Sequence, residues 1–173
     1  LDDASDGVVQ SVVAGFAPGT ARRYRRSSHA GLQQVNRYLS AHHEVGSFNT
    51  IAHRHDGEFL VGNTNLPTAN LNSYAQTLSS IGSNLKQGAD ILVYSCDTAA
   101  DATGLSFVYT LAQFTGHVVA SPSSNTGISG DWNLEVTTGD MTAQPVCSGR
   151  AQAQLQTCLA NRPCKNCNLR GAE

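Results

Sequence analysis

The sequence predicts an α/β fold in which a mostly parallel sheet has helices on both faces. Short apolar segments typical of strands alternate with longer segments that have the 3.6-residue period of a helix. The run DILVY at 90–94 is continuously apolar, which is typical of a strand buried on both faces of a parallel sheet. Hydrophobic residues make up 40% of the 173 residues and charged residues 14%, so the chain has enough apolar surface for one core.

The first half of the chain is predicted to form helices and strands in alternation. Valines and Phe16 recur at helical spacing over residues 7–16, and Pro18 and Gly19 end that helix. The expected elements that follow are a helix at 30–43, strands at 48–53 and 58–61, and a helix at 70–85 capped by Thr68.

The second half continues the alternation and then changes character. The elements expected here are the strand at 90–94, a helix at 102–115 that ends at Gly116, a strand at 117–120 and a late strand at 131–136. We therefore predict an α/β domain over residues 1–142, followed by a cysteine-rich tail over residues 143–173.

Charge and hydropathy exclude several classes of protein. The net charge of -2 gives no overall basic field of the kind that holds nucleic acid. The longest uncharged apolar run is far shorter than the roughly 20 residues that span a bilayer, so we expect no transmembrane segment. We expect no cofactor and no resident metal.

The five cysteines are unevenly distributed: Cys96 stands alone, and four others crowd the end of the chain. Those four are Cys147, Cys158, Cys164 and Cys167. Two disulfides are the favoured interpretation, because a tail with little core of its own needs a covalent constraint; a zinc site is the alternative, since Cys164-x-x-Cys167 is a metal-ligand spacing. Sequence alone leaves the pairing open. Disulfides imply an oxidising compartment: secreted, periplasmic or an organelle lumen.

Two predicted strands end in reactive side chains. His53 closes the strand at 48–53, and Cys96 follows the strand at 90–94. Because ligands bind at the carboxyl ends of strands in open α/β sheets, neighbouring strands would bring these two side chains together. An imidazole lowers the pKa of a nearby thiol, and the resulting thiolate attacks carbonyl carbons. The alternatives are a buried apolar cysteine and a hydrogen-bonded strand-end histidine.

Several segments of the chain resemble those of a known family. They are IAH at 51–53, LVGNT at 60–64, GADILVYSCD at 88–97, LAQFTG at 111–116, VAS at 119–121 and GDWNLE at 130–135. Together they are similar to a caspase-like domain family of unknown function from large bacterial surface and adhesin-type proteins. That family belongs to the superfamily of caspases, gingipains and self-cleaving toxin proteases. The resemblance implies a three-layer caspase-like fold, with Cys96 as the nucleophile and His53 as the base and acid.

The resemblance also implies roles for the neighbours of these two residues. In the superfamily a glycine after the histidine supplies a backbone N–H to the oxyanion hole, and here Arg54 holds that position. His55 is a rival base, because alternate residues of an extended segment share a face. Asp56 and Asp97 are candidates for binding a basic substrate side chain, although solvated loop carboxylates are the simpler interpretation.

The beginning of the chain departs from the family. By this resemblance we expect the first strand of the caspase-like order to be missing from the given sequence, and an arginine-rich segment stands where the second is expected. Its cations are Arg22, Arg23, Arg25 and Arg26. A solvated edge that blocks aggregation and a docking patch for an acidic partner are both open interpretations. Because burying unpaired charge is costly, we expect residues 21–26 at the sheet edge or outside it.

These observations support two candidate functions. The first is a caspase-like or gingipain-like cysteine peptidase, self-processing or acting on a peptide or protein substrate through the Cys96–His53 dyad. The second is a catalytically silent module of the same fold, a subunit of an extracellular or lumenal assembly with a partner protein at the broken sheet edge. The intact dyad favours the first function. Arg54, the expected absence of the first strand and the disulfide tail favour the second.

Overall fold

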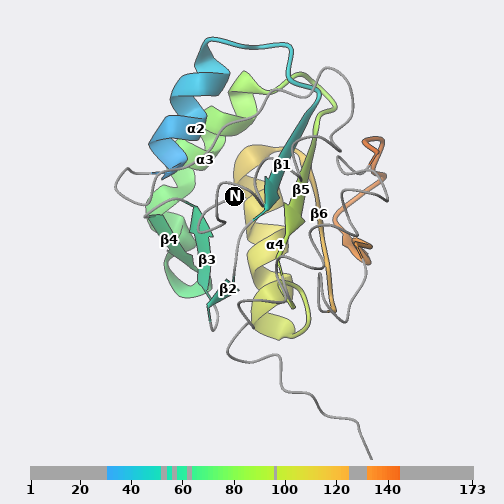
Figure 1. Cartoon of the computed structure of the whole chain (residues 1–173). Helices are drawn as coiled ribbons and strands as arrows, with labels where there is room; N and C mark the ends of the chain where they lie inside the picture. The colour runs from blue at the N-terminus through green and yellow to red at the C-terminus, as the bar shows by residue number, and fades with distance from the viewer. Residues whose placement is uncertain are drawn as a thin grey trace, which may run out of the picture.

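The computed structural model describes residues 31–51, 54–55, 58–61, 64–95, 97–124 and 132–144. Its main sheet has the strand order β1-β5-β6-β7 (Figure 1). The strands are β1 (Ser47–Ile51), β5 (Asp90–Tyr94), β6 (Val118–Ser121) and β7 (Val136–Thr137). β1, β5 and β6 run parallel, and β7 is antiparallel to β6. The predicted α/β class with a mostly parallel sheet is therefore confirmed.

In the described part of the chain, three helices and a short 3₁₀ segment accompany the sheet (Figure 1). They are α2 (Gly31–Ser40), η1 (Thr68–Tyr74), α3 (Ala75–Asn84) and α4 (Ala102–Thr115). The helix expected at 70–85 begins later than predicted, because Asn70 has a non-helical φ of -124° and the preceding turns are 3₁₀. Asp101 caps α4 through Gly104 N, at 2.7 Å, and Gly116 ends it at a φ of 73°.

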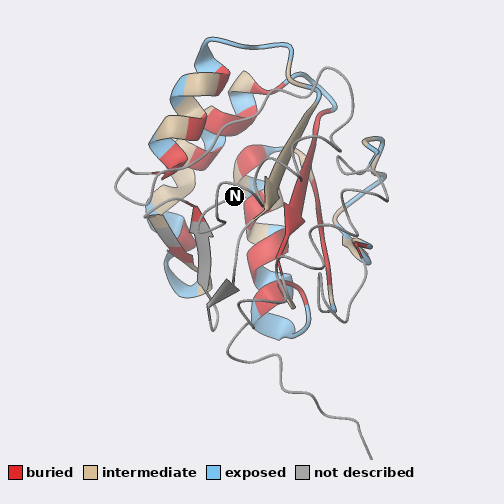
Figure 2. Cartoon of the chain, viewed as in Figure 1, coloured by how far each residue is buried: buried red, intermediate tan, exposed pale blue. Residues whose placement is uncertain are grey.

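The helices pack on one face of the sheet within the described part of the chain. Ile91, Val93 and Val119 point to that face and share one apolar core with α2, α3 and α4. β5 is buried along its whole length (Figure 2), as its continuous apolar run predicts. Helices were predicted on both faces of the sheet, and the described residues show them on one face. The first expected helix, residues 7–16, lies outside the described residues.

A second, smaller sheet interrupts the connection from β1 to α3. It consists of β2 (Arg54–His55), β3 (Glu58–Val61) and β4 (Thr64–Pro67), all antiparallel. The strand at 58–61 was expected, and β4 was not. Only two residues separate β2 from β3 and two separate β3 from β4, the spacing of tight hairpins.

The late strand expected at 131–136 is wrong in most of its length. Of its described residues only Val136 pairs with β6, and the pairing continues to Thr137. The preceding residues are held by side chains instead of by a backbone ladder: Trp132 packs on Tyr94 with ring centroids 5.6 Å apart, and Glu135 binds Ser123. The alternating apolar and polar residues therefore reflect side chains that point alternately into the core and into solvent, in a segment that does not pair as a strand.

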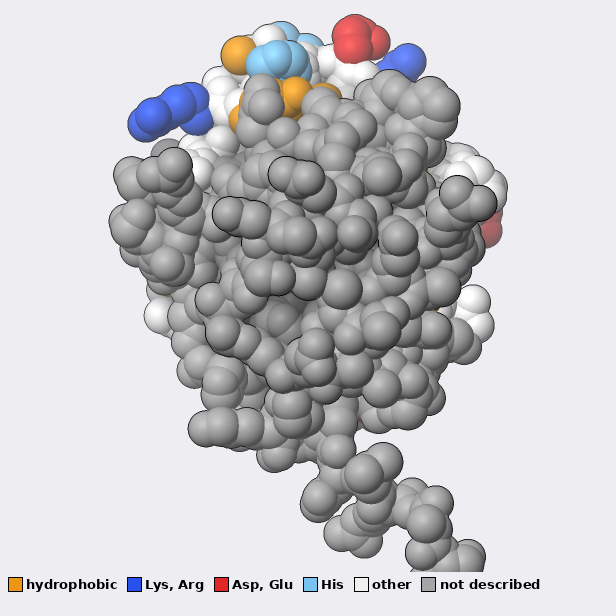
Figure 3. Space-filling model, in the orientation of Figure 1, with side chains coloured by type: hydrophobic (Ala, Val, Ile, Leu, Met, Phe, Trp, Pro, Cys, Tyr) orange, Lys and Arg blue, Asp and Glu red, His pale blue; other side chains and the backbone are white. Residues whose placement is uncertain are grey.

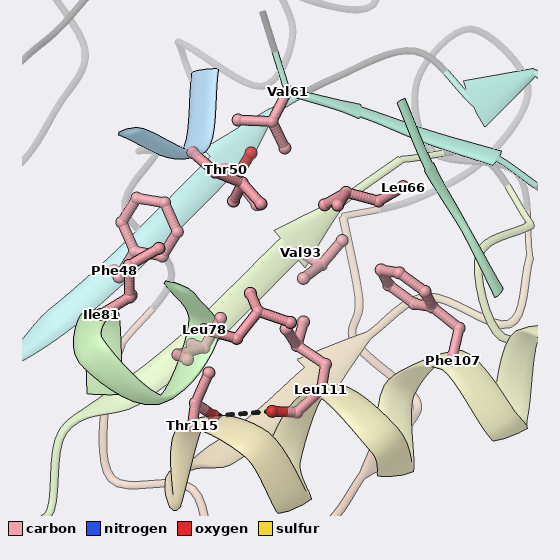
Figure 4. Close-up of a pocket in the computed structure, with 12 residues that line it drawn as sticks. Phe48, Thr50, Val61, Leu66, Leu78, Ile81, Val93, Phe107, Leu111 and Thr115 are labelled. Atoms are coloured by element: carbon pink, nitrogen blue, oxygen red, sulfur yellow. Dashed lines mark hydrogen bonds between the residues drawn. The ribbon is translucent and has the colours of Figure 1, made fainter. Parts of the chain in front are cut away.

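A small apolar cavity of about 30 Å³ lies between the sheet and the helices (Figure 4). Its wall includes Phe48, Val93, Phe107 and Leu111, and its hydroxyls belong to two threonines. One of these, Thr115, donates its hydroxyl to Leu111 O at 2.8 Å. The cavity has about the volume of one water molecule and no converging charges, so we assign it to imperfect packing of the core.

Charged side chains gather at the amino end of the sheet, where the parallel strands begin. Glu44 and Lys86 form an exposed ion pair at 3.8 Å. Figure 3 shows acidic, basic and histidine side chains at the top of the view, where the strands of Figure 1 begin. No helix among the described residues is long and apolar enough to cross a membrane.

Asp90, at the start of β5, anchors the chain after β7. Its side chain is 1% exposed, and its Oδ2 accepts three hydrogen bonds. The donors are Thr142 N at 2.8 Å, Thr142 Oγ1 at 2.9 Å and Ala143 N at 2.6 Å. One buried carboxylate therefore fixes residues 142–143 against the amino end of the sheet.

We expect Asp90→Ala to lower the free energy of unfolding by about 3 kcal/mol, because it leaves buried N–H groups without an acceptor. Urea denaturation of the whole chain measures this change. Asp140→Ala removes an exposed carboxylate from the same segment and should shift the midpoint little. Equal midpoints for the two variants would contradict the anchoring role of Asp90.

Candidate functional site

The carboxyl ends of β1 and β5 lie side by side. The two strands pair in parallel from Ser47 with Asp90 to Ile51 with Tyr94. In the sequence, His53 follows Ile51 by two residues and Cys96 follows Tyr94 by two residues. His53 and Cys96 themselves lie outside the described residues, whereas the segments on both sides of each are described.

The loop that follows Cys96 is tightly ordered by its own hydrogen bonds. Ser95 is buried, and its carbonyl accepts the hydroxyl of Thr98 at 3.1 Å. Asp97 has a φ of 51°, the left-handed conformation that aspartate tolerates better than most side chains. Ala100 N donates to Asp97 O at 3.3 Å, which completes the turn into α4. Backbone conformations of this kind are concentrated at functional sites.

The same loop is fixed to the chain that leaves β6. Asp97 N donates to Ser124 O at 3.1 Å, and Ala99 N donates to Pro122 O at 2.9 Å. On its other side the loop contacts α4 so closely that no side chain fits at Gly104: a Cβ there would lie 2.0 Å from Thr98 O. The segment after Cys96 is therefore held by both the neighbouring strand and the following helix.

The histidine side of the site is formed by the β2–β3 hairpin. Arg54 pairs with Phe59, and His55 pairs with Glu58 across a two-residue connection. In such a hairpin the closing pair exchanges both backbone hydrogen bonds, and the next pair exchanges none. The backbone N–H of Arg54 thus faces away from β3, while that of His55 is used within the hairpin.

Buried polar atoms accompany the carboxyl end of β6. Ser121 is fully buried, and its hydroxyl has no hydrogen-bond partner among the described residues. Trp132 is 6% exposed and packs on Tyr94, the last residue of β5. Trp132 belongs to the segment GDWNLE, which carried part of the resemblance. That segment therefore contacts the carboxyl end of β5 through its tryptophan.

Comparison with known proteins identifies the family. Residues 3–159 match the family described as a domain of unknown function (DUF4347). The chain belongs to this family. The match covers most of the α/β domain and extends into the tail, past Cys158. Neither a search of the curated proteins nor a search of the solved structures found a match.

The remaining site predictions for this DUF4347 domain fall on other parts of the chain. Asp97 is described, directly after the position of Cys96 in the chain. The other predicted site residues lie outside the described ranges: Asp56, Arg22, Arg23, Arg25, Arg26, Cys147, Cys158, Cys164 and Cys167. Within the described ranges no three His, Cys, Asp or Glu side chains gather where a metal ion could bind.

Sequence reasoning missed the residues that fix the loop from outside. Pro122 and Ser124 accept its backbone hydrogen bonds, and Glu135 binds the segment that contains Ser124. Every residue has a backbone carbonyl, so the sequence does not indicate which carbonyls accept these hydrogen bonds. The one available signal was Glu135 itself, an acid within the conspicuous GDWNLE segment.

Proposed function

We propose that this chain is a caspase-like cysteine peptidase in which Cys96 is the nucleophile and His53 the general acid and base. The observation that carries the proposal is the parallel pairing of β1 with β5, which ends at Ile51 and Tyr94. His53 follows Ile51 by two residues, and Cys96 follows Tyr94 by two residues. We therefore propose that the two side chains meet at this edge of the sheet. A thiol and an imidazole at that edge match the chemistry that the resemblance implies.

The proposed reaction is acyl transfer through a thioester. The Cys96 thiolate attacks the peptide carbonyl carbon, and the carbonyl oxygen becomes an oxyanion. The His53 imidazolium gives its proton to the leaving amine as the C–N bond breaks, and neutral His53 then takes a proton from the water that hydrolyses the thioester. The N–H of Arg54, which the hairpin leaves unused, is the proposed oxyanion donor.

The position of the hairpin favours His53 over His55 as the base. His55 belongs to the closing pair of the hairpin with Glu58, one residue farther from β1 than Arg54. His53 is the histidine nearer the end of β1 in the chain. Asp56 and Asp97 remain proposals for contacts with a basic substrate side chain.

A silent module of the same fold is the second candidate, and β1 is the observation that favours it. β1 pairs with β5 on one side, and no other described strand pairs with it. Every residue of β1 is half-buried, in contrast to the fully buried β5. A strand from residues 22–26 or from a partner protein would complete this edge.

The proposal extends to the tail and the compartment. Two disulfides among the four clustered cysteines would constrain residues 143–173, and they would place the protein in an oxidising compartment. The three-layer caspase-like architecture is part of the same proposal. It is supported by the sheet order and by the tight β5–α4 connection that bears the candidate nucleophile.

The test is cleavage of a mixed peptide library by the whole chain, with new termini detected by mass spectrometry. We expect cleavage by the wild-type chain and none by Cys96→Ala, because the variant lacks the attacking sulfur. The exposed serine change Ser79→Ala, on α3, is the matched control and should cleave normally. Library cleavage that persists in Cys96→Ala, or is absent from the wild type, would favour the silent module.

A further inference from the structure

Glu135 is connected through hydrogen bonds to Asp97, the residue that follows the candidate nucleophile in the chain. Its Oε2 accepts from Ser123 N at 2.7 Å and from Ser123 Oγ at 3.2 Å. Its Oε1 accepts from Ser124 Oγ at 3.3 Å. The Ser124 carbonyl in turn accepts the N–H of Asp97, the residue covalently next to Cys96. One exposed carboxylate thus binds both residues of the dipeptide that holds the nucleophile loop.

The backbone of Glu135 is itself fixed. The next residue, Val136, pairs with Ser121 at the end of β6. Ser123 and Ser124 follow the same strand by two and three residues, so the carboxylate bridges the end of β6 and the start of β7. Bonds from backbone N–H and hydroxyl groups to a carboxylate are charge-assisted, which makes them stronger than bonds between neutral groups.

From these contacts we infer that Glu135 is a positioning residue for the loop after Cys96: its carboxylate fixes Ser123–Ser124, and Ser124 O fixes Asp97 N, the backbone amide of the residue that follows Cys96 in the chain. The inference rests on the proposed function for its catalytic meaning. A left-handed residue such as Asp97 needs external contacts to keep its conformation, and the bond from Asp97 N to Ser124 O is one of them. Small displacements of a nucleophile greatly reduce the rate of attack.

The amide of Ala99 supplies an internal reference for this inference. Ala99 N donates to Pro122 O, which lies before the residues that Glu135 binds. Loss of the carboxylate should therefore loosen the Asp97 amide more than the Ala99 amide. A general destabilisation of the domain would instead speed hydrogen exchange at both amides.

The experiment combines amide hydrogen exchange with alkylation of Cys96 by iodoacetamide, located by peptide mapping, across a range of pH. In Glu135→Ala we expect exchange at Asp97 to rise about tenfold, with little change at Ala99. The alkylation rate of Cys96 should fall several-fold, with its pH profile shifted toward that of an ordinary thiol. Glu135→Gln keeps an acceptor oxygen for Ser123 N and should restore most of both properties.

Glu44→Ala is the matched control, because it removes an exposed carboxylate at the far end of the sheet. It should change neither readout. Unchanged exchange at Asp97 in Glu135→Ala would overturn the inference, and so would faster exchange at Asp97 with an unchanged alkylation profile. If wild-type Cys96 reacts as an ordinary thiol, the proposed peptidase fails, and exchange at Asp97 still decides whether Glu135 positions the loop.

Discussion

Replacing His53 by alanine is expected to lower the rate of peptide cleavage by about 1,000-fold, within the range that general acid–base catalysis contributes. The variant loses the group that generates the thiolate and the group that protonates the leaving amine. Both losses act on the chemical step, so kcat should fall while KM changes little. Steady-state kinetics on a peptide selected from the library assay measures the effect.

His55→Ala is the matched control for this prediction. It removes an imidazole two residues away, from the closing pair of the β2–β3 hairpin. Its kcat should stay within about threefold of wild type, because the proposed reaction moves no proton to or from His55. A severe loss in His55→Ala together with an active His53→Ala would assign the base to His55.

The second large effect is expected at Gly104, in the first turn of α4. An alanine Cβ would lie 2.0 Å from Thr98 O and 3.0 Å from the Cα of Ala99, and both contacts are backbone atoms that cannot rotate away. The loop or the helix has to move, so Gly104→Ala should lower the free energy of unfolding by about 3 kcal/mol, at the upper end for overpacking. Urea denaturation measures the loss.

Gly104 also lets the loop after Cys96 lie close to α4. We therefore expect the cleavage rate of Gly104→Ala to fall by more than the loss of folded protein alone would cause. Gly46→Ala is the control, because no atom lies within 4 Å of its added Cβ. That variant should unfold at the wild-type urea concentration. A Gly104→Ala protein as stable as Gly46→Ala would show that α4 and the loop are not in close contact.

The parts of the fold that the sequence predicted well are those with local signals. The strand at 90–94 is buried on both faces and reads as an unbroken apolar run. The helix at 102–115 was predicted with its observed bounds, since Gly116 stops it and its apolar period is regular. Local patterns of this kind need no knowledge of the rest of the chain.

The parts that could not be predicted depend on contacts between distant residues. Nothing near Asp90 indicates that it binds residues 142–143, and nothing near Glu135 indicates Ser123 and Ser124. The late strand failed for the same reason, because packing of Trp132 on Tyr94 competes with strand pairing. For the candidate site, the edge of the sheet was predictable from the strand ends, whereas the hydrogen bonds that fix its loop were not.

The pH dependence of Cys96 alkylation tests the central claim most directly, because it reports the thiolate without requiring a substrate. We expect Cys96 to react with an apparent pKa below the value of about 8.5 for a free thiol, since the His53 imidazolium stabilises the thiolate. In His53→Ala the profile should return to that of a free thiol. A wild-type profile like that of a free thiol, unchanged by His53→Ala, would contradict the dyad.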